Sequence, residues 1–106
     1  MKLMTVVLVL AFASGSAVAF ATERSIMQKG KAFSETSLTV KKGDTLTFIN
    51  DDTIIHNVMS NTAGSEFNLG SQAPGSTSTV TLSTVGEITI ICAIHPRMKI
   101  AVTVEQ

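Results

Sequence analysis

The clearest structural pattern in the chain is TSLTVKKGDTLTFIND, residues 36–51 of 106. Leu38 and Val40 alternate with polar residues, and Leu46 and Phe48 alternate with threonines after the Lys-Lys-Gly-Asp segment between the two runs. A period of two, rich in threonine and branched residues, is typical of a half-buried β-strand. Lys-Lys-Gly-Asp has the composition of a tight turn. This stretch therefore predicts two short strands separated by a turn.

The same alternation recurs further along the chain. It is present in STSTVTLS at 76–83, in EITIICAI at 87–94 after a break at Gly86, and in the closing KIAVTVEQ at 99–106. Residues 61–75 are dense in glycine, serine, asparagine and proline, which predicts a loop with little regular structure. Several short strands with turns between them predict an all-β fold, a small antiparallel sandwich or barrel in one domain.

The N-terminal segment has the pattern of a secretory signal peptide. Lys2 supplies a positive start, an apolar run follows, and SGSAVAFA at 14–21 offers small residues at the spacing that a signal peptidase requires. Cleavage is expected after Ala19 or Ala21, which leaves a single domain over residues 22–106. The apolar run is shorter than the roughly 20 residues of a spanning helix, so we expect export to the periplasm and no membrane span in the mature form.

Cysteine count and charge narrow the possible functions. With one cysteine, the chain can form no internal disulfide, and in an oxidising compartment the thiol must be buried, paired with another chain or bound to a metal. The chain has eight basic and eight acidic residues, and removal of the signal peptide takes Lys2 away. No basic run is present, so we expect no nucleic-acid partner.

The chain's potential metal ligands are concentrated near its end. In CAIHPRMKI, residues 92–100, Cys92, His95 and Met98 follow one another within seven residues. His56, the other of two histidines, follows the strand that ends near Ile49. Two imidazoles, a thiolate and a weak thioether form the donor set of a mononuclear blue-copper centre.

Each of these residues also has an ordinary interpretation. A lone cysteine is usually a small buried apolar residue, a lone histidine a loop residue and a methionine part of the core. A structural zinc site normally needs four strong ligands, and a catalytic zinc site needs a general base that the sequence does not place nearby. A Cys-His hydrolytic pair would need an exposed thiol, whereas Cys92 ends an apolar strand and is expected to be buried.

These motifs resemble the cupredoxin family, in particular its amicyanin and plastocyanin branch with a short ligand loop. The resemblance extends from about Met27 to Val104 and includes the His-Asn-Val at 56–58 and the Cys-x-x-His-x-x-Met at 92–98. It implies a Greek-key β-sandwich in which Asn57 ties the two ligand-bearing loops together. It also implies one type 1 copper per chain, bound by His56, Cys92, His95 and Met98.

The resemblance further implies a function. We expect a soluble, monomeric electron carrier that cycles between Cu(I) and Cu(II) and meets a dehydrogenase, cytochrome or oxidase transiently near His95. The alternative is a periplasmic copper-binding protein for copper tolerance or sequestration. We do not expect an enzyme, because the four predicted ligands leave copper no obvious open position and no acid-base pair accompanies them.

Overall fold

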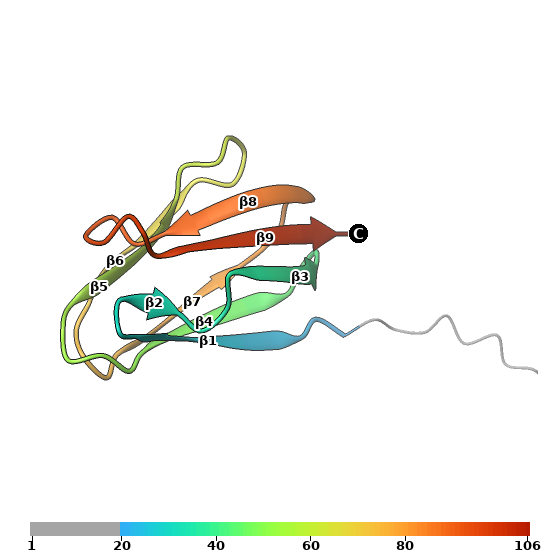
Figure 1. Ribbon diagram of the computed structural model, residues 1–106. Helices are drawn as coiled ribbons and strands as arrows, with labels where there is room; N and C mark the ends of the chain where they lie inside the picture. Colours follow the sequence, from blue (N-terminus) through green and yellow to red (C-terminus); the bar gives the residue numbers. More distant parts are fainter. Residues whose placement is uncertain (1–19) are drawn as a thin grey trace, which may run out of the picture.

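The computed structural model describes residues 20–106, which form nine β-strands in two packed sheets (Figure 1). The strands are β1 Glu23–Lys29, β2 Ala32–Phe33, β3 Ser37–Lys41, β4 Thr45–Asn50, β5 His56–Ser60, β6 Phe67–Gln72, β7 Thr77–Thr81, β8 Gly86–Ile91 and β9 Lys99–Glu105. The predicted signal peptide lies outside the described residues except for its last two positions. Across residues 20–106, no helix has the length and hydropathy that a bilayer span requires.

The two sheets form the predicted all-β sandwich. Sheet one has the strand order β2-β1-β4-β7, and sheet two has the order β3-β9-β8-β5-β6. Most strand pairs are antiparallel, as expected from the sequence, but β1 pairs with β4 and β3 pairs with β9 in parallel. The two strands of residues 36–51 belong to different sheets, so the turn between them carries the chain across the sandwich. Period-two alternation indicates strands, but it does not indicate their partners.

The prediction of a loop with little regular structure over residues 61–75 is wrong for residues 67–72. This segment contains β6, an edge strand of sheet two that pairs with β5 in an interrupted register. An edge strand has a neighbour on one side only, and β6 leaves most of its side chains partly exposed. Its inward-facing apolar residues are only Phe67 and Leu69, which pack against the core, and Gly70, with a φ of 78°, ends this short alternation.

The core lies between the sheets and consists of the residues that alternate inward along each strand. Phe48 from β4 and Phe33 from β2 meet edge to face, with ring centroids 5.8 Å apart. The fully or almost fully buried apolar residues include Ile26, Leu38, Val40, Leu46, Phe48, Val58, Ile88, Ile90, Ile100, Val102 and Val104. Burial on this scale supplies the main stabilisation of a domain that has no disulfide among its described residues.

The turn after β3 is fastened by a carboxylate. Asp44 accepts hydrogen bonds from the backbone N–H of Thr22 at 2.9 Å and of Lys41 at 2.8 Å. These two donors hold the pKa of the Asp44 carboxyl below its usual range. Gly43 adopts a φ of 93°, which only glycine tolerates well. The turn thereby links the start of β1 to the crossing between the sheets, at the end of the sandwich opposite the loop between β8 and β9 (Figure 1).

Phe48→Ala tests how far the fold depends on this core. Because Phe48 is completely buried, its truncation should leave a cavity and lower the free energy of unfolding by about 3–5 kcal/mol. The measurement is chemical denaturation followed by circular dichroism. Ile49→Ala is the matched control, since Ile49 is the next residue on the same strand and is only partly buried. Equal losses for the two variants would contradict this description of the core.

Candidate metal centre

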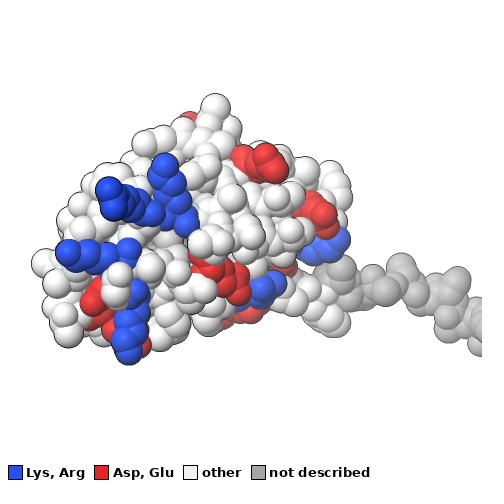
Figure 2. Space-filling model, in the orientation of Figure 1, with Lys and Arg blue, Asp and Glu red and all other residues white. Residues whose placement is uncertain are grey.

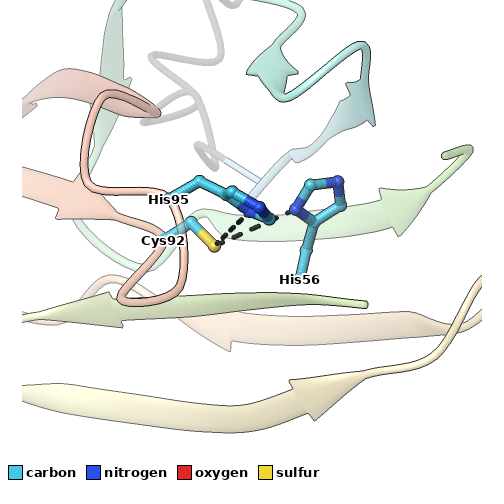
Figure 3. A group of neighbouring side chains, drawn as sticks. All are labelled: His56, Cys92 and His95. Atoms are coloured by element: carbon cyan, nitrogen blue, oxygen red, sulfur yellow. Dashed lines mark hydrogen bonds between the residues drawn. The ribbon is translucent and has the colours of Figure 1, made fainter. Parts of the chain in front are cut away.

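Three side chains from two distant segments converge at one end of the sandwich (Figure 3). His56 is the first residue of β5, Cys92 directly follows β8, and His95 lies in the loop between β8 and β9. The Cys92 Sγ atom lies 3.9 Å from Nδ1 of His56 and 3.9 Å from Nδ1 of His95. One donor atom from each residue lies within 4.8 Å of the others. The structure thus brings together the three strong ligands predicted from the sequence.

The loop from residue 92 to residue 98 is closed by its own backbone. The Met98 N–H donates to the His95 carbonyl at 2.9 Å, and the Cys92 N–H donates to the Met98 carbonyl at 3.2 Å. Met98 is 1% exposed and belongs to the same buried cluster as Cys92. The loop therefore brings Met98 back to Cys92, which is where a fourth ligand would have to enter. Its role as a ligand stays a prediction.

Burial differs between the two histidines. His56 and Cys92 are completely buried, and His95 is only partly buried. The burial predicted for Cys92 is confirmed, and it argues against a hydrolytic thiol, which must reach its substrate. The expectation that His56 lies in a loop is wrong, because its backbone already pairs with Gln72 of β6. Strand pairing gives His56 a fixed backbone, whereas His95 depends on the short loop.

The spacing of the donor atoms fits a bound metal ion. Imidazole and thiolate bonds of about 2.0 and 2.3 Å around a trigonal centre place nitrogen and sulfur about 3.8 Å apart, close to the observed separations. Two imidazoles and one thiolate in a trigonal arrangement, with a weak thioether, are the ligands of a blue-copper site. Among the described residues, the cluster contains three strong donors rather than the four of a closed structural zinc site.

Asn57 connects the two ligand-bearing segments, as predicted. Its backbone N–H donates to the Cys92 Sγ at 3.3 Å, and its Oδ1 atom accepts from the Ala93 N–H at 3.1 Å. Its Nδ2 group donates to Asn68 Oδ1 at 2.9 Å and to the Gly70 carbonyl at 3.0 Å. The side chain of Asn57 therefore holds β5, β6 and the ligand loop in one arrangement.

Asp52 orients His56 from the side opposite the cluster and was not predicted from the sequence. Its Oδ2 atom lies 2.9 Å from His56 Nε2 and accepts a further bond from the Lys31 N–H at 3.1 Å, and its Oδ1 atom accepts from the Thr53 N–H at 2.9 Å. These bonds, chiefly the one from His56, lower the pKa of Asp52 to about 2. An ionised carboxylate keeps the proton on Nε2 and leaves the Nδ1 lone pair free for a metal.

Comparison with known proteins supports a copper site. The model of the family described as copper-binding proteins, plastocyanin/azurin family, matches residues 20–105. No curated protein matched the chain in a sequence comparison. A reduced tryptophan-to-tyrosine mutant of amicyanin is 25% identical, has a TM-score of 0.72, and the match covers 84% of this chain and 87% of amicyanin.

Two further solved structures extend the comparison. A purple cupredoxin from Nitrosopumilus maritimus is 25% identical with a TM-score of 0.67, and the match covers 76% of this chain and 98% of that protein. The copper-containing nitrite reductase from Thermus scotoductus is 24% identical with a TM-score of 0.71, and 77% of this chain matches. The chain spans only 22% of that reductase, so this likeness concerns the fold alone.

Asp52→Asn tests the role of the carboxylate behind His56. An amide orients the ring less strongly and carries no charge, so Cu(II) affinity should fall by about 10- to 100-fold. Loss of a negative charge beside the ligand should also raise the reduction potential. Chelator competition and voltammetry measure the two effects. The control is Asp51→Asn, because Asp51 is an exposed neighbour whose contact is with Lys29, at 3.7 Å. Equal copper affinities and equal reduction potentials in the two variants would refute the assigned role of Asp52.

Proposed function

Because the chain belongs to the plastocyanin/azurin family of copper-binding proteins, we propose that it carries single electrons between protein partners. One type 1 copper ion per chain supplies the Cu(I)/Cu(II) couple when bound. The proposed ligands are His56, Cys92, His95 and Met98. The proposed carrier is a soluble monomer, exported to the periplasm by residues 1–21, whose transient partner is a dehydrogenase, a cytochrome or an oxidase.

This proposal rests on one observation: residues outside the donor cluster hold two of its members in place by hydrogen bonds. Asn57 holds the Cys92 sulfur through its backbone N–H, and Asp52 holds the far nitrogen of His56. Hydrogen bonds of this kind set the orientation of metal ligands. Ligands that the fold holds in place change little when the charge of the metal changes. Small rearrangement is what fast one-electron exchange needs.

His95 supplies the route between the cluster and the surface. Its ring stands edge to face with that of His56, with centroids 5.2 Å apart, and it lines a surface groove with Ile94 and Pro96. Of the three clustered ligands it alone is partly exposed. An electron therefore has to cross only the His95 side chain to pass between the cluster and a docked partner.

Copper sequestration, the alternative function, receives less support. Proteins that store or buffer copper often carry additional thioethers and imidazoles. Among the described residues, Met27 and Met59 are the only methionines besides Met98, and His56 and His95 are the only histidines. An enzymatic role is also less well supported, because the carboxylate nearest the cluster, Asp52, is already engaged by His56.

Voltammetry of the Met98→Gln variant tests both the function and the fourth ligand. The wild-type copper protein should give a reversible one-electron wave. A thioether favours Cu(I) and an amide oxygen favours Cu(II), so the variant should keep its copper but have a lower midpoint potential. If Met98 were only a core residue, the buried amide would cost about 1–3 kcal/mol of stability and leave the potential unchanged.

Met59→Gln is the matched control for this experiment. Met59 lies on β5, three residues after His56, and is partly buried. Its substitution should leave the midpoint potential at the wild-type value. A lowered melting temperature with an unchanged potential in Met98→Gln would refute the ligand role. An irreversible wave in the wild-type protein would count against electron transfer itself.

A further inference from the structure

The groove at His95 combines two segments of the chain that are far apart in sequence. It is lined by Ile94, His95, Pro96 and Arg97 from the ligand loop and by Lys31 from the turn between β1 and β2. The turn is held there because the Lys31 N–H donates to the same Asp52 oxygen that contacts His56. A second molecule that reaches His95 must therefore also meet Lys31 and Arg97.

Lys31 occupies this position at a conformational cost. Gly30 and Lys31 have φ angles of 61° and 55°, and Lys31 is the only residue other than glycine with a positive φ among residues 20–106. The left-handed region is unfavourable for a residue with a side chain. The two residues form the two-residue turn of the β1–β2 hairpin, with Lys29 paired to Ala32, and a tight hairpin turn of this kind requires positive φ at both positions. The hydrogen bond from the Lys31 N–H to Asp52 then fixes this turn beside His56.

Positive charge is concentrated at this end of the molecule. Four of the seven cationic side chains in residues 20–106 belong to these two segments or directly flank them: Lys29, Lys31, Arg97 and Lys99. Figure 2 shows lysine and arginine side chains gathered at the end that carries the β1–β2 turn and the loop between β8 and β9, with few acidic side chains among them. Within the described part of the chain, no carboxylate lies within ion-pair distance of Lys31, Arg97 or Lys99.

Carboxylates outnumber cations at the opposite end of the molecule, where Arg24, Lys41 and Lys42 also lie. Asp51 and Asp52 are the acidic residues beside the groove, and one is paired with Lys29 and the other with His56. Most other carboxylates lie at strand ends away from the groove, among them Glu23, Glu66, Glu87 and Glu105. A near-neutral protein with separated charges orients an approaching charged partner even though its net charge is small.

An exposed apolar side chain, Ile94, lines the groove beside these cations. Ile94 is 50% exposed and Ile55 is 52% exposed, and each directly precedes one of the clustered histidines. They are two of the four large hydrophobic residues that remain exposed in residues 20–106. Apolar residues inside a charged rim are typical of a surface that binds another protein. We call the surface that lines the groove the basic face: Lys31, Ile94, His95, Pro96 and Arg97. Lys99 is exposed and directly follows the ligand loop in sequence.

We propose that the basic face docks an acidic surface of the redox partner, with His95 against the partner at the centre of the contact. This inference rests on the proposed electron-carrier function and adds the chemistry of the partner. Complementary charge steers the encounter and sets the orientation, while Ile94 excludes water beside His95. A second copy of the chain is a poor occupant, because the same cations would face each other.

Electron-transfer kinetics with small probes of opposite charge test the proposal. The reduced copper protein is mixed in a stopped-flow instrument with trianionic hexacyanoferrate(III) or with tricationic tris(phenanthroline)cobalt(III). Reaction with the anion should slow as salt is added, and reaction with the cation should accelerate. The rate of reaction with hexacyanoferrate(III) should fall by on the order of three- to fivefold at about 0.01 M ionic strength in each of three variants, Lys31→Gln, Arg97→Gln and Lys99→Gln. Lys42→Gln, an exposed cation at the opposite end, is the control and should change little.

A protein probe then tests whether an acidic protein, and not only a small anion, docks at the basic face. Reduced cytochrome b5, a small acidic haem protein, should reduce the Cu(II) protein in a salt-sensitive reaction that the same three variants slow and Lys42→Gln does not. Ile94→Ser should slow this reaction but leave hexacyanoferrate(III) unaffected, because a small ion needs no apolar contact. Salt-independent rates, or equal effects of Lys42→Gln and Arg97→Gln, would overturn the docking proposal.

The outcomes separate this proposal from the function on which it rests. If both inorganic probes react quickly and without charge preference, electron transfer stands and the acidic partner is excluded. If neither probe exchanges electrons with the copper protein, the proposed function itself fails. Binding to phosphatidylserine vesicles that Arg97→Gln abolishes, with no salt-sensitive reaction with cytochrome b5, would make a membrane surface the occupant. Dimerisation lost in Arg97→Gln would make it a second copy of the chain.

Discussion

The hydrogen bonds of Asn57 are the constraint on which the metal site depends. One residue donates to the Cys92 sulfur, accepts from the backbone beside it and anchors itself to β6 through two further bonds. The position of the sulfur relative to β5 is therefore set by the fold rather than by a metal. His56 is the residue directly before Asn57, so the same strand positions the first imidazole.

The sandwich brings these groups together through its strand register. Strand β5 pairs antiparallel with β8, with Met59 opposite Ile91 and Ser60 opposite Ile90. Continued past the last pair, this register sets Asn57 opposite Ala93, where their hydrogen bond is observed. Residues 36 positions apart thus become neighbours through pairing alone. The loop that follows needs only to return His95 and Met98 to the same point.

Most of the fold and three of the site residues were predictable from particular features of the sequence. Alternation in residues 36–51 predicted β3 and β4, and the spacing of Cys92 and His95 predicted their convergence. Asp52 could not be predicted, because two adjacent aspartates precede His56 and only the turn geometry selects one of them. Strand β6 was missed because its apolar alternation is limited to Phe67 and Leu69 and stands in a segment rich in glycine, serine and asparagine. The approach of Lys31 to the site depends on a parallel pairing of β1 with β4, which no local pattern encodes.

The visible spectrum of the Cu(II) protein tests the central claim, that His56, Cys92 and His95 hold copper in one buried site. A bound thiolate should give intense charge-transfer absorption that disappears on reduction to Cu(I). Cys92→Ser should remove this absorption, because a hydroxyl is a far poorer ligand for copper than a thiolate, while circular dichroism should confirm that the variant is folded. A pale Cu(II) complex of the wild-type protein, or a strongly coloured Cys92→Ser variant, would contradict the account.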